Sequence, residues 1–134
     1  MMANSYMLHT IGVIRELDAA PRQGYEGAPD AWIEVFPPFE QALHRIVAGD
    51  ELIILTWLHR SARDVLQVHP RGEIENPLTG VFATRSPARP NPIGLHRVTV
   101  LEINGCRLKI GPIEAIDGTP VIDIKAALSQ LDDS

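Results

Sequence analysis

Apolar residues along this chain come in short runs, separated by polar stretches that are rich in proline and glycine. Runs of this kind with many β-branched residues are typical of strands. On this basis we expect strands over residues 8–16, 31–36, 51–59, 65–69, 80–84, 95–103, 106–111 and 119–125. The run 51–59 is the most apolar of them, which indicates a buried central strand.

Other patterns describe the segments between these strands. Residues 37–50 begin with proline, carry apolar side chains at Phe39, Leu43, Ile46 and Val47, and reach Gly49, which predicts a short amphipathic helix. Asn104-Gly105 is a favoured two-residue turn, so a hairpin should join 95–103 to 106–111. We expect a long loop over 18–30 and a short terminal helix or tail over 126–134.

Many short strands, long loops and little helix favour a mainly β protein. We expect a small closed or nearly closed β-barrel with one or two short helices. The length of 134 residues suits one domain with a core of its own, and no repeat or linker divides the chain. The prediction is a single domain over 1–134, with its core over about 8–125.

The segment 85–94, RSPARPNPIG, combines three prolines with two arginines. Each proline fixes its own φ, removes an N–H donor and pushes the preceding residue toward extended geometry. The segment can be neither a helix nor a central strand, so we expect a stiff, extended loop. Gly94 leaves room for a positive φ or for a ligand close to the backbone. The two arginines favour a binding role over a plain turn.

Charge is distributed unevenly along the sequence. The formal net charge is −5, which argues against a nucleic-acid platform that covers the whole surface. Residues 59–97 nevertheless hold six arginines against three acidic residues. Arginine binds carboxylates, phosphates and base edges through paired hydrogen bonds, so an anionic ligand is expected here. Alternatively, some of these arginines are solvated or pair locally, as Arg60 would with Asp64.

Several classes of site lack their motifs. The chain has no glycine fingerprint of a Rossmann fold or a P-loop, and no G-x-S-x-G nucleophile motif. Its five histidines and Cys106 show no metal-ligand spacing, so we expect no metal. A single cysteine allows no internal disulfide and suits the cytoplasm. The first residues lack the pattern of a signal peptide, and no run has membrane-spanning length, so we expect no membrane association.

Candidate chemistry gathers on four loops. PRQG (21–24) and HRSARD (59–64) carry arginines, and the second loop follows the central strand, where the rim of a barrel would lie. The third loop is 85–94. The fourth, GPIEAIDGTP (111–120), contains the turn signal Asp117-Gly118. Asp117 is either a turn-forming residue or a member of a site.

The stretch GVFATRSPARPNPIGLHRV, followed by DGTPVIDIK, strongly resembles the TsaA-like family, also called TrmO. These are tRNA N6-threonylcarbamoyladenosine methyltransferases. The resemblance extends over nearly the whole chain, through IGVIRE, PRQG and LHRS. It implies a small β-barrel that binds S-adenosylmethionine, forms a homodimer, and methylates N6 of threonylcarbamoyladenosine beside a tRNA anticodon. The chain departs from the family pattern at Ala126-Ala127, where relatives often have Pro-Tyr.

The resemblance also implies where the cofactor is bound. Its contacts would be Arg22, Gln23, Gly24, His59, Arg60, Arg85, Leu95, Gly111, Pro112, Ile113 and Glu114. Arginine and backbone N–H groups suit the carboxylate of S-adenosylmethionine, acidic groups suit its cationic centres, and apolar side chains suit its adenine. A stiff loop holds such groups in place at little entropic cost on binding, which explains the prolines.

Substrate and catalytic residues are expected close to these loops. The candidates for contact with the RNA are Arg89, Asn91, Asp123 and Lys125. Arg89 starts about 13 Å from Arg85 in extended chain, too far for both to bind one carboxylate. It meets an RNA phosphate or is a solvated loop charge. The base for the reacting N–H is either Asp117 or His59.

Two other functions stay open at this level. The same fold and cofactor would serve a substrate other than tRNA, which the acidic composition favours. A module that binds the cofactor without turnover is the other alternative.

Overall fold

The computed structural model describes residues 4–17 and 29–128. Its strands are β1 (Gly12–Glu16), β2 (Ala31–Val35), β3 (Glu51–Trp57), β4 (Gln67–Val68), β5 (Thr79–Gly80), β6 (Ile93–Asn104), β7 (Arg107–Gly111) and β8 (Pro120–Ala126). Short 3₁₀ segments accompany them as η1 (Pro37–Leu43), η2 (Pro70–Gly72) and η3 (Val81–Ala83).

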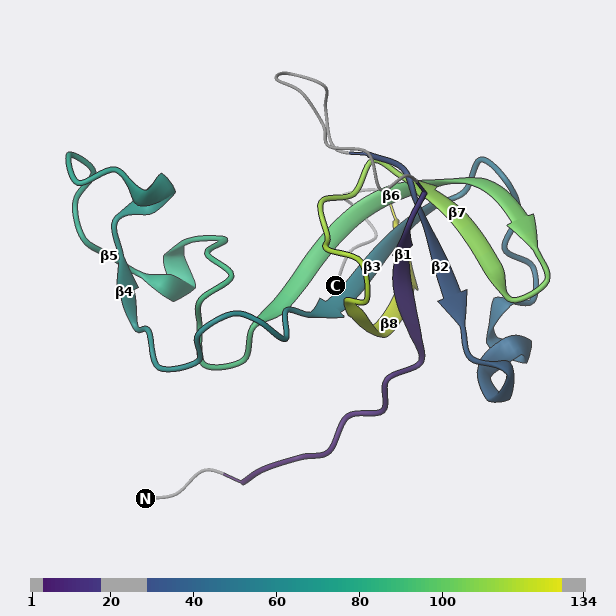
Figure 1. Ribbon diagram of the computed structural model, residues 1–134, viewed down its shortest axis with the longest axis horizontal. Helices are drawn as coiled ribbons and strands as arrows, with labels where there is room; N and C mark the ends of the chain where they lie inside the picture. Colours follow the sequence, from purple (N-terminus) through teal and green to yellow (C-terminus); the bar gives the residue numbers. More distant parts are fainter. Residues whose placement is uncertain (1–3, 18–28, 129–134) are drawn as a thin grey trace.

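Six of the strands form a closed barrel in the order β1-β2-β7-β6-β3-β8, and all neighbours run antiparallel (Figure 1). β3 lies between β6 and β8 and pairs with β6 along its whole length, from Glu51↔Thr99 to Trp57↔Ile93. The ring closes through β1 and β8 at Gly12↔Val121 and Val13↔Pro120. The mainly β fold and the barrel predicted from the sequence are confirmed.

The barrel has a continuous aliphatic core, because its strands bury alternate side chains. The alternation is complete along β2 and β3. The core includes Ile14, Ile33, Leu52, Ile54, Val98, Val100, Leu108, Ile110 and Val121. Each large aliphatic side chain buried in this way contributes about 1.5–3 kcal/mol. This core fixes the ring from which the loops emerge.

Residues 58–92 leave the barrel after β3 and return to it at β6; they are termed the excursion. It carries β4, β5, η2 and η3 and projects to one side of the barrel (Figure 1). Val81 is deeply buried within it, at 2% exposure. Its exposed apolar side chains are Leu66, Ile74, Leu78 and Phe82, at 54% to 83% exposure. The excursion therefore has little core of its own.

The helix expected over 37–50 is shorter and of another kind. The chain forms a 3₁₀ segment over Pro37–Leu43 and then turns at Arg45 (φ 76°) and Gly49 (φ 96°), both left-handed. An α-helix cannot pass through left-handed residues. Of the four apolar side chains that suggested the helix, three pack against the core and Val47 is exposed.

The strand expected over 80–84 is also wrong. Only Thr79–Gly80 pairs, with β4, and the chain then bends into η3. The Val81 carbonyl accepts the N–H and the hydroxyl of Thr84 and a guanidinium N–H of Arg89. These contacts turn the chain back on itself and prevent a longer ladder.

Other boundaries move by smaller amounts. β6 begins at Ile93, so the stiff loop expected over 85–94 ends at Pro92. The hairpin turn falls on Gly105-Cys106, because Asn104 pairs with Arg107. Gly105 has φ 63°, as the first central residue of a type II′ turn requires. The remaining strands lie where the pattern predicts them, and several are shorter.

Candidate functional site

A pocket of about 380 Å³ opens at the end of the barrel where β3 finishes and β8 starts. Its walls come from three segments that are distant in sequence: Pro29 before β2, residues 58–61 after β3, and residues between 114 and 119 before β8. Three of the residues expected to bind the cofactor meet here, namely His59, Arg60 and Glu114. This pocket is the candidate functional site.

The pocket combines apolar surface with a few polar groups. The apolar lining includes Leu58, Ala115 and Ile116, and the polar lining includes His59, Arg60, Ser61 and Glu114. The side chains of His59, Arg60 and Glu114 are exposed and therefore accessible to a ligand. The lining is mostly apolar, and two of its residues, Arg60 and Glu114, carry a guanidinium and a carboxylate. This combination suits a ligand that carries apolar surface and both signs of charge.

Close backbone packing holds the pocket wall that follows β7. Gly111 is buried, and a Cβ at this position would overlap the carboxylate of Asp30. The N–H of Ile113 donates to the Pro29 carbonyl oxygen at 2.8 Å, and the Ile113 side chain lies in the core. Gly111 and Ile113 therefore set the path of this wall. Pro112 between them is exposed. Of the residues expected at the cofactor over 111–114, Glu114 is the one that lines the pocket.

The far end of the same wall is tied to β1. Asp117 Oδ1 accepts the N–H of Glu16 at 3.0 Å, and Oδ2 lies 3.5 Å from Nη1 of Arg15. Gly118 (φ 87°) donates its N–H to a β1 carbonyl at 2.8 Å. Asp117 thus shapes a turn and faces β1, whereas His59 lines the pocket. Of the two bases that the sequence left open, only His59 lies at the site.

The wall after β3 is held where the two ends of the excursion meet; this place is termed the neck. The N–H of Leu58 donates to the Pro92 carbonyl at 2.7 Å. Further along, the N–H of Arg89 donates to the Ala62 carbonyl at 3.1 Å. The proline-rich loop therefore supports the segment that carries the pocket's imidazole and guanidinium.

Arg63 reinforces the neck. Its guanidinium lies 5.0 Å from the ring centroid of Trp57, at the end of β3. Nε donates to the Pro90 carbonyl at 2.8 Å, and Nη2 to Asn91 Oδ1 at 3.3 Å. Asn91, expected at the substrate, is in this way engaged with the neck.

Arg89 has a structural role within the excursion. Its Nη1 donates to the carbonyls of Thr84 at 3.2 Å and Ser86 at 3.0 Å, and its Nη2 to the carbonyl of Val81 at 2.9 Å. The side chain is partly buried. These bonds hold the proline-rich loop in its bend. They contradict the expectation of a solvated loop charge, and the contact of Arg89 with RNA stays a prediction.

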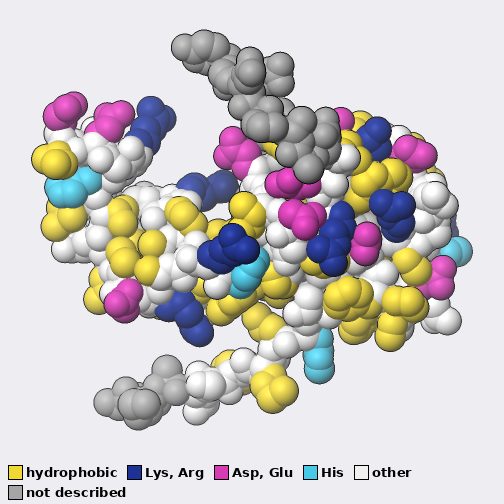
Figure 2. Space-filling model, viewed as in Figure 1, with side chains coloured by type: hydrophobic (Ala, Val, Ile, Leu, Met, Phe, Trp, Pro, Cys, Tyr) yellow, Lys and Arg dark blue, Asp and Glu magenta, His cyan; other side chains and the backbone are white. Residues whose placement is uncertain are grey.

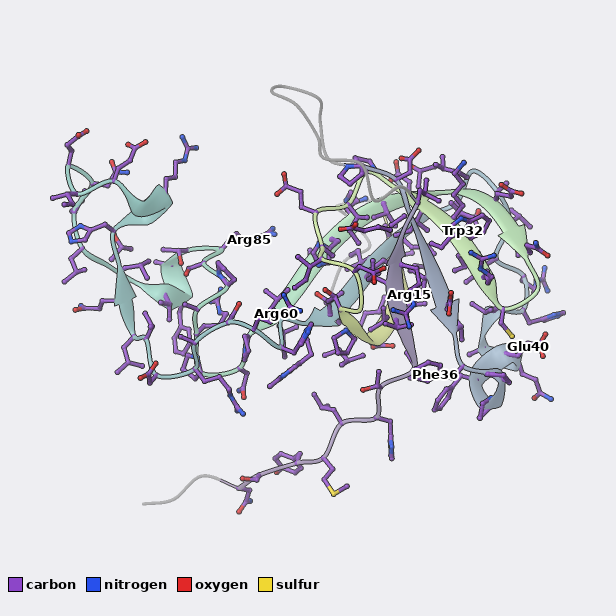
Figure 3. The ribbon with its side chains drawn as sticks, viewed as in Figure 1. Arg15, Trp32, Phe36, Glu40, Arg60 and Arg85 are labelled. Carbon is purple, nitrogen blue, oxygen red and sulfur yellow. The ribbon has the colours of Figure 1, made fainter. Side chains whose placement is uncertain are left out.

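Other expected residues lie outside the pocket. Arg85 is exposed on the excursion and lines a separate hollow of about 830 Å³ together with Arg71. Figure 3 shows Arg60 and Arg85 on different segments. Leu95 is 47% exposed on β6 and does not line the pocket. Arg22, Gln23 and Gly24 are outside the described residues.

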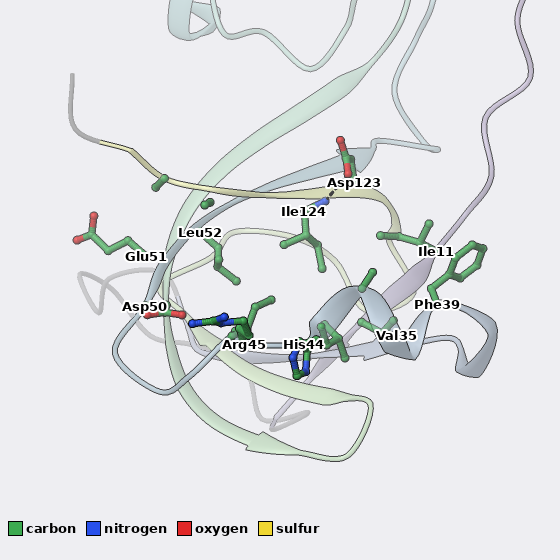
Figure 4. Close-up of a pocket in the computed structure, with 15 residues that line it drawn as sticks. Ile11, Val35, Phe39, His44, Arg45, Asp50, Glu51, Leu52, Asp123 and Ile124 are labelled. Carbon is green, nitrogen blue, oxygen red and sulfur yellow. Dashed lines mark hydrogen bonds between the residues drawn. The ribbon is translucent and has the colours of Figure 1, made fainter. Parts of the chain in front are cut away.

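Asp123 and Lys125 lie toward the opposite end of the barrel. Asp123 lines a second pocket of about 500 Å³, where β3 starts and β2 and β8 end (Figure 4). Its Oδ1 accepts the N–H of Ile124 at 2.9 Å, and its Oδ2 lies 3.6 Å from Nζ of Lys125. The structure does not bring this pair together with the candidate site.

His96 was not expected from the sequence. It is partly buried in the barrel end that carries the pocket, with Nε2 2.9 Å from Thr56 Oγ1. Burial lowers the pKa of His96 from its usual value of 6.5, and the Glu114 carboxylate opposes this shift. A Cβ at Gly94 would lie 2.5 Å from that hydroxyl oxygen, so the glycine leaves room for the pair. The inward face of β6, with Gly94, His96 and Val98 on alternate positions, is the signal that could have found it.

The described part of the chain contains neither a cluster of metal ligands nor an activated thiol. No three His, Cys, Asp or Glu side chains of residues 4–17 and 29–128 gather as metal ligands would. Burial and the neighbouring Glu40 raise the pKa of the Cys106 thiol, which disfavours its reactive thiolate. Over the same ranges, every helical segment falls short of the length needed to cross a membrane.

Residues 11–133 match the model of a protein family, described as the tRNA-methyltransferase O N-terminal domain. The chain belongs to the TrmO family. An S-adenosyl-L-methionine-binding protein of Archaeoglobus fulgidus is 42% identical over 130 residues, which cover 94% of this chain and 92% of that protein. Family membership, expected from the proline-rich motif, is confirmed, and S-adenosylmethionine is confirmed as the cofactor at the level of the family.

Solved TrmO structures share the fold. A crystal structure of TrmO aligns with a TM-score of 0.73 at 30% identity, over 100% of this chain and 60% of that one. TrmO from Pseudomonas aeruginosa aligns with a TM-score of 0.70 at 29% identity, over 98% of this chain and 60% of that one. The chain therefore spans about 60% of the length of these two TrmO chains.

Proposed function

We propose that the protein is an S-adenosylmethionine-dependent methyltransferase that acts on tRNA, at N6 of threonylcarbamoyladenosine beside the anticodon. One observation carries the proposal: His59, Arg60 and Glu114 line a single pocket at the mouth of the barrel. They come from loops that are far apart in the sequence, and the family resemblance assigns all three to the cofactor.

The pocket suits S-adenosylmethionine in size and chemistry. Its volume of about 380 Å³ is typical of small-molecule sites. Arg60 would hold the carboxylate, because guanidinium–carboxylate pairs are strong and directional. Glu114 would face the cationic groups, and Leu58 and Ile116 offer apolar surface to the adenine. When bound, the cofactor supplies an electrophilic methyl group.

The residues of the pocket have three tasks in this reaction. When the two reactants bind, they displace water from the apolar walls, which strengthens the charged contacts beside them. One wall of the pocket is bonded to β1 and the other is held at the neck. These two walls hold the reactants in line, and alignment contributes much of the rate of a displacement. His59 accepts the proton of the reacting N–H, because its ring nitrogen is the basic group among the residues that line the pocket.

We propose further that two copies of the chain complete each site. Arg85 and Leu95 do not line the pocket of their own chain, although the resemblance assigns both to the cofactor. The excursion carries Arg85 away from the barrel, and hydrophobic side chains are exposed on it (Figure 2). An exposed apolar surface of this kind marks a protein interface. A homodimer in which each excursion reaches the other barrel would bring Arg85 to that barrel's pocket.

The reaction is tested with purified protein, methyl-labelled S-adenosylmethionine and total RNA from a strain that lacks the modification. Mass spectrometry of the nucleosides should find the label in threonylcarbamoyladenosine. Arg60→Gln should abolish labelling and His59→Gln should slow it, whereas Arg45→Gln, at the other end of the barrel, should have no effect. Label in another substrate would overturn the assignment of tRNA as the substrate. Cofactor binding without turnover would overturn the proposal that the protein is an enzyme.

The shared site is tested by mixing two inactive variants, Arg60→Gln and Arg85→Gln. If the two arginines of one site come from different chains, mixed dimers hold one intact site. Statistical mixing then restores roughly a quarter of the wild-type activity. Light scattering that finds a monomer, or a mixture that stays inactive, would overturn the shared site.

A further inference from the structure

The outer face of β1, β2 and β7 carries a row of aromatic and charged side chains. The register places Arg15, Trp32 and Lys109 opposite one another on the three strands, and Glu34 opposite Arg107 in the neighbouring row. Residues between them along the strands are buried in the core, so these five side chains face outward. Figure 3 shows Arg15 and Trp32 on the neighbouring strands β1 and β2.

Trp32 is the centre of this face. Its side chain is only partly buried, and the guanidinium of Arg107 lies 4.3 Å from its ring centroid. Such a stack stabilises a sheet surface by itself. It also presents an aromatic ring beside a cation, which is the combination on which unpaired bases stack in single-strand-binding proteins.

The charges of the face favour a polyanion. Arg15 lies 3.9 Å from a carboxylate oxygen of Glu34 and 3.5 Å from one of Asp117. Within residues 4–17 and 29–128, Arg107 and Lys109 form no ion pair, although Arg107 has Glu34 opposite it. The guanidinium of Arg107 turns to the ring instead. Within the same ranges, no carboxylate neutralises these two cations, and both lie on the strand next to Trp32.

The face lies beside the candidate site. Trp32 is three residues from Pro29, which lines the pocket, and this is about 10 Å of extended chain. At the other end of the row, Arg15 contacts Asp117, next to the pocket residue Ile116. A nucleic-acid strand with one base at the pocket would continue across this face.

We propose that Trp32, with Arg15, Arg107 and Lys109, forms a platform for the substrate RNA next to the base that is methylated. An unpaired base stacks on Trp32, and the cations meet the adjoining phosphates. Anticodon loops offer such bases, because RNA loops expose nucleotides that helices hide. The proposal rests on the proposed function, since it takes RNA as the substrate.

Fluorescence of the two tryptophans tests the platform. In Trp57→Phe the remaining tryptophan is Trp32, and a short unstructured RNA of A and U should quench its emission. In Trp32→Phe, which keeps an aromatic ring, RNA should bind with similar affinity without such quenching. Trp32→Ala should weaken binding about 5- to 150-fold, the loss of one stacked base. Heparin, a polyanion without bases, should leave the emission of Trp32 unchanged.

Three results would overturn the platform: no RNA binding, RNA binding without quenching of Trp32, or equal affinity of Trp32→Ala and wild type. Lys109→Gln should also flatten the salt dependence of RNA binding by about 0.7 in the logarithmic slope, as one lost phosphate contact does. Circular dichroism and calorimetry with S-adenosylmethionine show whether each variant is folded. Quenching without methyl transfer would refute the reaction alone, and methyl transfer without quenching would refute the platform alone.

Discussion

The barrel and the excursion are held together by different kinds of contact. The barrel has six paired strands around an aliphatic core. The excursion has one two-stranded ladder, and its bends are fixed by side chains bonded to backbone carbonyls, such as Asn76 Nδ2 to Pro70 at 2.8 Å and Arg89 to Val81 at 2.9 Å. Apolar area therefore sets the stability of the barrel, whereas a few polar contacts set the shape of the excursion.

The largest expected effect comes from the barrel core. Leu108 is fully buried on β7, and Leu108→Ala leaves a cavity that the ring cannot fill. We expect a loss of about 2–5 kcal/mol in the free energy of unfolding, measured with chemical denaturant. Leu101→Ala, at a 43% exposed position of β6, should cost far less. Equal losses in the two variants would contradict a barrel stabilised by its core.

In the excursion, one side chain should matter most. Arg89→Ala removes three hydrogen bonds to carbonyls, and we expect a local loss of about 1.5–3 kcal/mol. Hydrogen exchange should accelerate over residues 58–92 and stay slow in the barrel strands. Arg85→Ala, which removes an exposed arginine from the same loop, is the matched control. Faster exchange in both variants would refute the special role of Arg89.

An exposed apolar residue of the excursion should affect assembly without affecting stability. Phe82 is 82% exposed, so Phe82→Ser should change the free energy of unfolding of the chain by less than about 0.5 kcal/mol. If the excursion packs on a second copy, the dimer should dissociate at least about tenfold more readily, as sedimentation would measure. Leu101→Ser on the barrel should leave assembly unchanged. An unaltered Phe82→Ser dimer would remove Phe82 from the interface.

The smallest expected effect concerns pH. Burial lowers the pKa of His96 in the folded chain, so below the usual value of 6.5 the unfolded chain takes up this proton first. The stability that neutral His96 contributes is therefore fully present above that pH. It decreases as the pH falls toward the lowered pKa of the folded chain. In His96→Gln, the difference in the free energy of unfolding between about pH 7.5 and 5.5 should shrink. His44→Gln, at an exposed position, should keep the wild-type difference, and a larger difference in His96→Gln would reverse the sign of the argument.

Sequence patterns were sufficient for the barrel and insufficient for the excursion. β2 and β3 bury alternate residues, and the apolar runs that form them are visible in the sequence. Residues 80–84 have strand-like composition, yet the Val81 carbonyl is bound by Thr84 and Arg89 and the chain bends. Backbone carbonyls are the same at every position, so a side chain that bonds to one leaves no mark in a hydrophobic pattern.

Among the site residues, too, some were predicted from the sequence and others were not. The resemblance to the TrmO family predicted His59, Arg60 and Glu114 together, and in the structure they share a pocket. Arg85 was expected with them, but the strand pattern does not encode how far the excursion carries this arginine from its own barrel. His96 was not predicted because what distinguishes it is its burial beside Thr56. That contact joins two strands and cannot be seen along one stretch of sequence.

Leu58 and Pro92 are joined by a backbone hydrogen bond of 2.7 Å, so the chain leaves and re-enters the ring at nearly the same point. In polymer terms, the residues between them form a long closed loop, and its closure entropy opposes the pairing of β3 with β6. This entropy grows with the logarithm of loop length, so a turn of a few residues in place of 59–91 would save about 2 kcal/mol. Such a shortened chain keeps every strand of the ring and loses Arg60 and Arg85. The long loop therefore opposes folding through its closure entropy, and what it adds to the ring includes the side chains of Arg60 and Arg85.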